Sequence, residues 1–230
     1  MRRYIFSPFE PFLMILFLLL PFLLIIFSFA IPLAFVKLGL PIHIALIVFL
    51  LAIIGSTINI PVKKIHVSQG FIEETSISFW GIRYSIPVGR FQDTIIAINL
   101  GGAIIPIIVS IYQIIRTLFI YHNILLLLQM IIGVTVISLI CYHIARPVRG
   151  VGIAMPALIP PISAAVISII LNPFHASAIA YVSGTLGTLI GADILNLLEV
   201  KDLNTPIVSI GGAGTFDGIF LTGIIAVLLL

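Results

Sequence analysis

Residues 207–230 read IVSIGGAGTFDGIFLTGIIAVLLL, an apolar stretch in which Asp217 is the only charged side chain. About 20 mostly apolar residues in a helix are enough to cross the hydrocarbon core of a bilayer. The apolar stretch before it, Ala176–Leu198, carries Asp193. A carboxylate in hydrocarbon costs about 2.5 kcal/mol or more, so these two acids are the first candidates for a functional site.

The composition of the whole chain belongs to the same class of protein. Of its 230 residues, 61% are hydrophobic and 8% are charged, and the mean hydropathy is +1.32. Soluble domains are far more polar, so this composition is typical of a polytopic membrane protein. We predict an all-α membrane protein with about seven transmembrane helices, and we treat residues 1–230 as a single membrane domain. The seven stretches that qualify are Pro11–Ala30, Pro41–Ile60, Thr94–Ile115, Asn123–His143, Gly152–Leu171, Ala176–Leu198 and Ile207–Leu230.

The lysines and arginines predict the orientation, because short loops rich in them stay on the cytoplasmic side. With seven crossings, one face collects only Lys37 and Arg116. The other face collects Arg2, Arg3, Lys63, Lys64, Arg83, Arg90, Arg146, Arg149 and Lys201. We therefore expect an integral protein of a prokaryotic plasma membrane, with the N-terminus in the cytoplasm and the C-terminus outside. Topology anchoring and contacts to anionic lipid headgroups explain the net charge of +3, so no nucleic-acid partner is expected.

The one sizeable polar stretch, residues 62–92, lies on the cytoplasmic face. Apolar and polar residues alternate in it, as at Ile77 and Phe79 and again at Ile82, Tyr84 and Ile86. This alternation favours two or three short strands, so we predict a small β-hairpin inserted between the second and third helices. The hairpin either plugs one end of the bundle or holds an extended peptide by strand addition.

The depth of the two aspartates follows from their spacing. Residues 201–206 form a short cytoplasmic turn, so the sixth and seventh helices are expected to be antiparallel neighbours. Asp193 lies about 12 Å of helix before this turn and Asp217 about 16 Å after it, at a rise of about 1.5 Å per residue. Both acids are therefore expected at a similar depth, in the cytoplasmic half of the membrane.

A pair of close carboxyl groups has a chemical use. Two such groups cannot both ionise, so they share a proton, one acting as a base toward a water and the other as an acid. Hydrolysis of a peptide bond is the reaction that this arrangement serves best. It needs no metal or cofactor, and we expect none, since no Cys/His spacing would hold zinc and Cys141 is the only cysteine. The structural alternative is a protonated pair that joins two helices by hydrogen bonds to Asn196, Thr188 or backbone.

The residues around Asp217 carry a resemblance to a known group. Gly214-Thr215-Phe216-Asp217-Gly218 is similar to the glycine-x-hydrophobic-aspartate variant of the motif of membrane aspartyl proteases, the presenilin, signal peptide peptidase and prepilin peptidase group. Gly191-Ala192-Asp193 is comparable to the first aspartate of that group, although the tyrosine that precedes it in presenilins is absent. Pro156-Ala157-Leu158 matches the tripeptide that supports the active site in presenilins and signal peptide peptidases. In those families the tripeptide follows both aspartates, whereas here it precedes them.

The chain also resembles, along most of its length, a family of archaeal and bacterial integral membrane proteins of unknown function. The resemblance rests on Asn59-Ile60-Pro61, Asn99-Leu100-Gly101-Gly102, Gly191-Ala192-Asp193 and Gly214–Gly218. It names relatives and implies no activity.

Several residues are expected to support the two acids. Gly191, Gly214 and Gly218 let another backbone or a substrate come close. Asn99 either breaks the third helix and points its amide at the acids, or precedes a pair of glycines, Gly101 and Gly102, that serve only close helix packing.

Together these observations predict an intramembrane aspartyl protease that uses Asp193 and Asp217 to cleave a transmembrane peptide embedded in the lipid bilayer. The second hypothesis is a proton- or cation-coupled transporter that binds the ion with the same acids beside broken helices. The third is an inactive scaffold or lipid-binding protein of the same fold. The oligomeric state does not follow from the sequence.

Overall fold

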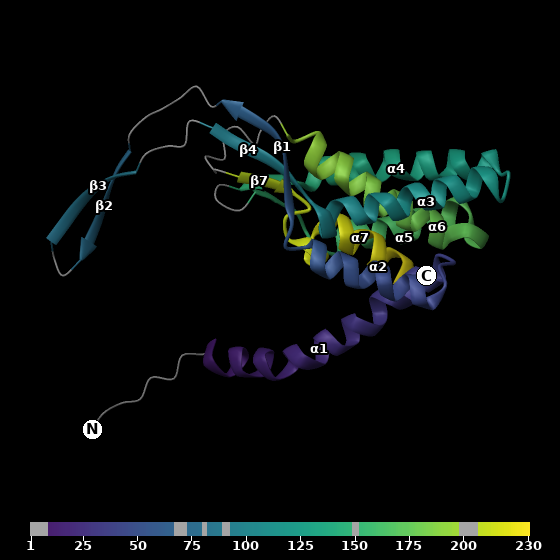
Figure 1. Ribbon diagram of the computed structural model, residues 1–230, viewed down its shortest axis with the longest axis horizontal. Coiled ribbons are helices and arrows are strands. Elements are labelled where there is room, and N and C mark those ends of the chain that lie inside the picture. The colour runs from purple at the N-terminus through teal and green to yellow at the C-terminus, as the bar shows by residue number, and fades with distance from the viewer. Residues whose placement is uncertain (1–8, 67–72, 80–81, 89–92, 149–151, 198–206) are drawn as a thin grey trace.

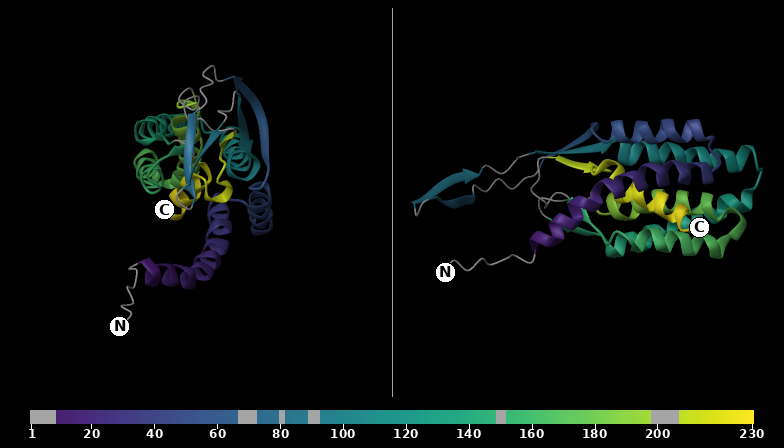
Figure 2. Two further views of the ribbon diagram at one scale, coloured as in Figure 1. Left: turned by 90° about the vertical axis from the view of Figure 1, so that its left-hand side faces the viewer. Right: turned by 90° about the horizontal axis from the view of Figure 1, so that it is seen from below.

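Helices make up most of the structure, a computed structural model that describes residues 9–66, 73–79, 82–88, 93–148, 152–197 and 207–230. They run back and forth between two ends of the molecule, and the strands gather at one of these ends (Figures 1 and 2). The α-helices are α1 (Phe9–Lys37), α2 (Ile42–Gly55), α3 (Ile105–Phe119), α4 (Ile124–Ile144), α5 (Ile159–Leu171), α6 (Ala176–Thr188) and α7 (Gly218–Leu228).

Two of these helices continue as π-helix, in which the backbone bonds skip one residue more than in an α-helix. Segment η1 (Leu100–Ile104) leads into α3, and segment η3 (Leu189–Ile194) extends α6. Two single turns of 3₁₀-helix, η2 (Pro173–His175) and η5 (Gly214–Phe216), precede α6 and α7. Short π-helical segments are rare and occur frequently at functional sites, which draws attention to η1 and η3.

Among the described residues, three helices are long and apolar enough to cross a membrane: Leu100–Phe119, Ile124–Ile144 and Pro173–Ile194. Three apolar helices are shorter: Ile42–Gly55, Ile159–Leu171 and Gly218–Leu228. Of α1, the apolar part Ile25–Lys37 is counted with them, because the side chains before it are mostly not described. The prediction of a helical protein with membrane-type helices is therefore confirmed, and three of the predicted spans have full length.

A three-stranded sheet lies at the end of the molecule where α2, α4 and α6 finish (Figure 1). Its order is β1 (Asn59–His66), β4 (Asp93–Asn99) and β7 (Ile207–Ile210), with β1 antiparallel and β7 parallel to β4. Strands β2 (Glu73–Phe79) and β3 (Ile82–Val88) form an antiparallel hairpin that stands away from the helices. Strands β5 (Arg146–Val148) and β6 (Gly152–Ala154) form a second small hairpin. The predicted hairpin between α2 and α3 is present, and its flanking strands reach beyond residues 62–92 into the three-stranded sheet.

Several predicted spans are wrong as continuous helices. The stretches predicted from Thr94, Gly152 and Ile207 each begin as a strand, and the stretch ending at Ile60 finishes in β1. The cause is local: β-branched isoleucines favour strand at 95–98, prolines delay α5 to Ile159, and glycines separate β7 from α7. Hydropathy alone does not separate these cases, since a buried apolar strand and a helix have the same composition.

Helix α6 occupies the centre of the bundle. Of the three full-length helices, the one that contains it has 61% of its residues buried, against 39% and 33% for the other two. Its Gly184 packs on Thr222 of α7, and Gly223 of α7 packs on Tyr181 and Thr185 of α6. The positions rise along one helix as they fall along the other, so α6 and α7 are antiparallel neighbours, as predicted. Small residues at such crossings let the backbones approach closely, which is the usual way in which helices associate in lipid.

Candidate active site

Asp217 begins α7. Its backbone has an extended conformation, φ −73° and ψ 149°, and its carboxylate oxygen Oδ1 accepts a hydrogen bond of 3.0 Å from the backbone N–H of Ile219. The other oxygen, Oδ2, accepts one of 3.3 Å from the N–H of Ala213. Asp217 is therefore the N-cap of α7, where a carboxylate is favoured by the free N–H groups and by the positive end of the helix dipole. The prediction that it lies inside the seventh helix is corrected to the first residue outside it.

The loop before Asp217 is fixed by glycines and by α2. Gly211 and Gly214 have φ of +73° and +64°, in the left-handed region that favours glycine. A Cβ atom on Gly214 would collide with Ser56 at the end of α2, and the N–H of Thr215 donates a hydrogen bond of 3.0 Å to Ser56 Oγ. Gly102 of η1 packs directly on the carbonyl of Gly211. The loop is thus clamped between α2 and η1.

Asp193 lies on η3, one position before its last residue. Its side chain is partly buried, and within the described residues no hydrogen bond engages its carboxyl group. Asn196, a predicted hydrogen-bond partner, instead donates to the carbonyls of Gly191 and Ala192 at 3.0 and 2.9 Å. Thr188, the other predicted partner, contacts the thiol of Cys141 on α4, with 3.6 Å between Oγ1 and Sγ. The described contacts therefore do not include the structural bonds expected for a purely structural Asp193.

The packing of α6 on α7 brings the two acids to the same end of the bundle. Gly218, the residue after Asp217, lies against Thr188 of α6, whose Cγ2 is 3.8 Å from a Cβ built on the glycine. Asp193 follows Thr188 by five residues, on the π-helical continuation of α6.

Asn99 does not point its amide at the acids through a broken helix. It is the N-cap of η1, where its Oδ1 accepts a hydrogen bond of 2.8 Å from Gly102, and its amide nitrogen donates to the carbonyl of Ser56 at 2.8 Å. The same nitrogen lies 3.1 Å from Asn59 Oδ1. Asn99 therefore joins the end of α2, strand β1 and η1. It supports the Asp217 loop indirectly, because it holds Gly102, which packs on Gly211 of that loop.

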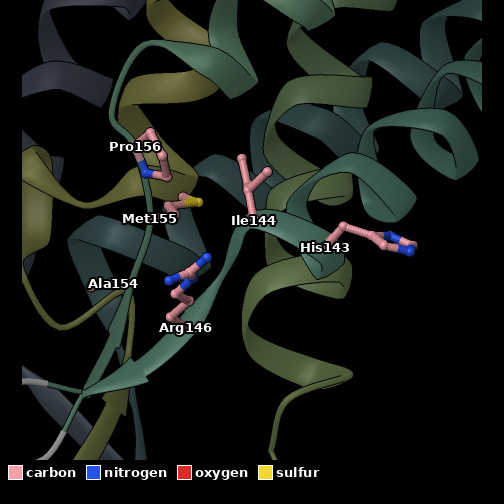
Figure 3. Close-up of a pocket in the computed structure, with 6 residues that line it drawn as sticks. All are labelled: His143, Ile144, Arg146, Ala154, Met155 and Pro156. Carbon is pink, nitrogen blue, oxygen red and sulfur yellow. The ribbon is translucent and has the colours of Figure 1, made fainter.

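The tripeptide Pro156-Ala157-Leu158 lies in the segment between β6 and α5. All three residues are exposed, and Leu158 is the last residue before α5. Met155, the residue before the tripeptide, packs on Gly218, next to Asp217. Met155 and Pro156 also line a hollow with His143, Ile144, Arg146 and Ala154 (Figure 3). The fold thus brings the tripeptide segment to the Asp217 side of the bundle, although it comes before both acids in the chain.

The three glycines named from the sequence have different neighbours. Gly191 faces the backbone of Ser138 on α4, Gly214 faces Ser56, and Gly218 faces Met155. Each contact is too close for a Cβ atom. Gly191 and Gly214 therefore allow close packing between segments of the protein. This is one of the two roles expected from the sequence, the other being close approach of a substrate.

Sequence reasoning missed Ser56 and Met155 as parts of this region. Ser56 follows Gly55 at the end of an apolar stretch, which reads only as a helix terminus, and Met155 has no motif of its own. The Asn59-Ile60-Pro61 and Asn99–Gly102 segments could have pointed to Ser56, because Asn99 bonds to both Ser56 and Asn59. Within the described ranges, no group of three or more His, Cys, Asp or Glu side chains is arranged to hold a metal ion.

Comparison with known proteins gives one family. A family model described as "Protein of unknown function (DUF1614)" matches residues 53–229, which include both aspartates, the tripeptide, Asn99 and every strand. No curated protein and no solved structure matches the chain.

Proposed function

The chain belongs to the DUF1614 family, a family of unknown function. For this member we propose an intramembrane hydrolase of the aspartyl protease type. Asp193 and Asp217 form its dyad. The proposal is carried by the placement of the two acids: the packing of α6 on α7 brings Asp193, near the end of η3, and Asp217, the N-cap of α7, to the same end of a bundle of apolar helices. An acid within such a bundle is costly and is usually retained for function.

We propose seven crossings, with the strands on the cytoplasmic side. The seven helices run alternately between the two ends of the molecule in both views (Figures 1 and 2). At the strand end lie Lys63, Lys64 and Arg146, whereas Lys37 and Arg116 lie at the other end. The excess of positive charge marks the cytoplasmic side, so the C-terminus is on the outside. Helices shorter than a full span are accommodated by local thinning of the bilayer or by the flanking strands.

The two acids take different parts in the reaction. Asp217 accepts two backbone N–H groups at the positive end of α7, which stabilise its carboxylate relative to that of Asp193, an acid with no such donor among the described residues. Asp217 accordingly takes a proton from the attacking water, whose oxygen bonds to the peptide carbonyl carbon. Asp193 gives its proton to the leaving nitrogen as the C–N bond breaks, and the proton on Asp217 then restores the pair.

The substrate is a transmembrane peptide that is unwound near the site. A helical peptide bond is shielded by its own hydrogen bonds, so an extended segment is needed beside the dyad. The exposed side chains of Ala157 and Leu158, beside the residue that packs on Gly218, are the contacts that we assign to this segment.

The test uses purified protein in liposomes with a single-span peptide labelled for fluorescence. The wild-type protein is expected to release fragments, and Asp193→Asn and Asp217→Asn are expected to lower the rate at least 100-fold, since each removes an acid or base. Asn is also a good N-cap, so Asp217→Asn keeps the fold. Lys37→Gln, at an exposed position on the opposite end of the bundle, is the control and should cleave normally. A wild-type protein that cleaves no such peptide contradicts the proposal.

One observation favours the second candidate function, an ion-coupled transporter. Three of the buried hydroxyl side chains on helix α6, Thr188, Thr185 and Tyr181, follow one another at helical spacing from the Asp193 end toward the opposite end of the bundle. The hydroxyls of Tyr181 and Thr185 have no hydrogen-bond partner in the described part of the chain. A transporter would carry protons into liposomes along a pH gradient together with a candidate solute, so the liposome interior would become more acidic. Asp193→Asn would stop this flux, and no peptide would be cut.

A further inference from the structure

A groove on the outside of α4 carries the further inference. It consists of two adjoining hollows that share His143 and Ile144. The first has a volume of about 340 Å³ and is otherwise lined by Leu139 and Ile140 of the helix. The second has a volume of about 440 Å³ and is otherwise lined by Arg146, Ala154, Met155 and Pro156 (Figure 3). We call the two together the α4 groove.

The two halves of the groove differ in chemistry. The first half runs along a predominantly apolar helix that is long enough to span a bilayer, Ile124–Ile144. The second half begins where this helix ends and contains the guanidinium of Arg146, which is directed toward Met155 (Figure 3). The groove is therefore apolar at membrane depth and cationic at the end of the helix.

The positive charge in the groove is available. Arg146 is exposed, and within the residues that the structure describes neither an ion pair nor a hydrogen bond engages its guanidinium. His143, by contrast, already has its Nδ1 at 2.8 Å from the carbonyl of Leu139, so its ring is tied to its own helix. Recognition of an anion therefore rests on Arg146.

We propose that the α4 groove binds one phospholipid with an anionic headgroup. The guanidinium of Arg146 takes the phosphate through paired N–H donors, and an acyl chain lies along Leu139, Ile140 and Ile144. A guanidinium matches the two oxygens of a phosphate better than a point charge does. Basic pockets at the cytoplasmic ends of membrane helices are a known way to hold such headgroups. This binding site is independent of whether the aspartates hydrolyse peptides.

The site has a route to the dyad region. Met155 lines the headgroup half of the groove and also packs on Gly218, the residue after Asp217. A lipid seated beside Met155 would therefore press on the same methionine that supports the start of α7. The occupant and the Asp217 loop thus share one side chain.

The experiment measures lipid retention by the full chain. Protein is released from nanodiscs of phosphatidylglycerol and phosphatidylcholine in equal parts and weighed by native mass spectrometry, so that bound lipids are counted by class. The wild-type protein is expected to retain phosphatidylglycerol over phosphatidylcholine, because both lipids present a phosphate but the choline cation of the second cancels the negative charge that attracts Arg146. Arg146→Gln should weaken this retention about tenfold, since a hydrogen-bonded charge pair is worth about that factor. Arg146→Lys should keep part of the preference.

Lys37→Gln is the matched control, because Lys37 is an exposed cation at the opposite end of the bundle. It should leave retention unchanged, and a thermal melt checks that each variant is folded. Equal loss in Lys37→Gln, or full retention in Arg146→Gln, overturns the proposal. Displacement of the lipid by millimolar inorganic phosphate alone overturns it as well, since this would assign the site to free phosphate.

Discussion

The two aspartates lie at the same end of the bundle, and yet the regions that hold them differ. Asp217 accepts hydrogen bonds from Ala213 and Ile219 and caps α7, so its carboxylate is part of the fold. Asp193 lies one residue before the end of a π-helical segment, and no hydrogen bond in the described residues uses its carboxyl group. Because Asp217 supports the backbone, a substitution there changes stability as well as any function. Asp193 has no such backbone role, so a substitution there changes function alone. Substitutions at the two positions therefore separate stability from chemistry.

The largest effect is expected in the support of the Asp217 loop. Gly102→Ala places a methyl group on the carbonyl of Gly211, where backbone faces backbone and no side chain can turn away. We expect a loss of about 3 kcal/mol in the free energy of unfolding, measured in detergent micelles. Gly184→Ala is the comparison, since its Cβ would meet Thr222 Cγ2 at 3.1 Å and the backbone of Thr222 and Gly223 at 3.2 and 3.3 Å, a milder clash that should cost about 1 kcal/mol. Equal costs would show that the loop is not clamped as described.

Alanine substitutions of Asp193 and Asp217 are expected to differ in their effect on stability. Asp217→Ala removes the N-cap of α7 and the partner of Ala213, so the expected loss of stability is about 2 kcal/mol. Asp193→Ala is expected to change stability by less than about 0.5 kcal/mol, because no hydrogen bond is lost. Thermal unfolding of both variants, with Asp217→Asn as the cap-preserving control, measures the difference. A larger loss at Asp193 than at Asp217 would reverse our assignment of roles.

A smaller effect is expected at the contact between α2 and the loop. Ser56→Ala removes the acceptor of the Thr215 N–H, and the expected cost is about 1 kcal/mol. Thr57→Ala is the matched control, because the Thr57 hydroxyl donates only to the exposed turn of its own helix, at Ile54. In the same unfolding assay, a loss in Thr57→Ala that equals the loss in Ser56→Ala would argue against the contact.

The smallest effect, with opposite sign, is expected on α6. The hydroxyl of Tyr181 is buried without a partner in the described residues, so Tyr181→Phe should leave stability unchanged or raise it by up to about 1 kcal/mol. Tyr181→Leu should instead destabilise, because the ring packs against Phe35 at a centroid distance of 6.2 Å. A loss on Tyr181→Phe would indicate a partner for the hydroxyl, such as a bound water or ion, and would favour the transporter.

Sequence reasoning succeeded where composition and local pattern carry the information. The helix of residues 124–144 was predicted to within one residue at each end, and alternation predicted the β2–β3 hairpin. The antiparallel packing of the sixth and seventh helices followed from the short connection predicted between them. The connection itself, at 201–206, lies outside the described residues, but the packing of α6 on α7 agrees with it.

Reasoning from pattern failed where a strand and a helix share the same composition. Strand β7 was assigned to the last helix, because Ile207–Ile210 is as apolar as any span. It becomes a strand because β4, more than 100 residues earlier in the chain, offers it a parallel partner from Ile95 to Ile98. No local signal records that pairing.

The helical, membrane-type character of the chain and the choice of two acids follow from the amino-acid sequence, because the transfer of each residue from water to lipid depends mainly on the residue itself. The π-helical turn at Asp193, the capping role of Asp217 and the clamp from Ser56 and Gly102 come from tertiary structure. These features depend on which backbone groups meet across elements distant in sequence. In a bundle without a hydrophobic driving force between its helices, close packing and hydrogen bonds decide that meeting, and both are properties of the assembled fold.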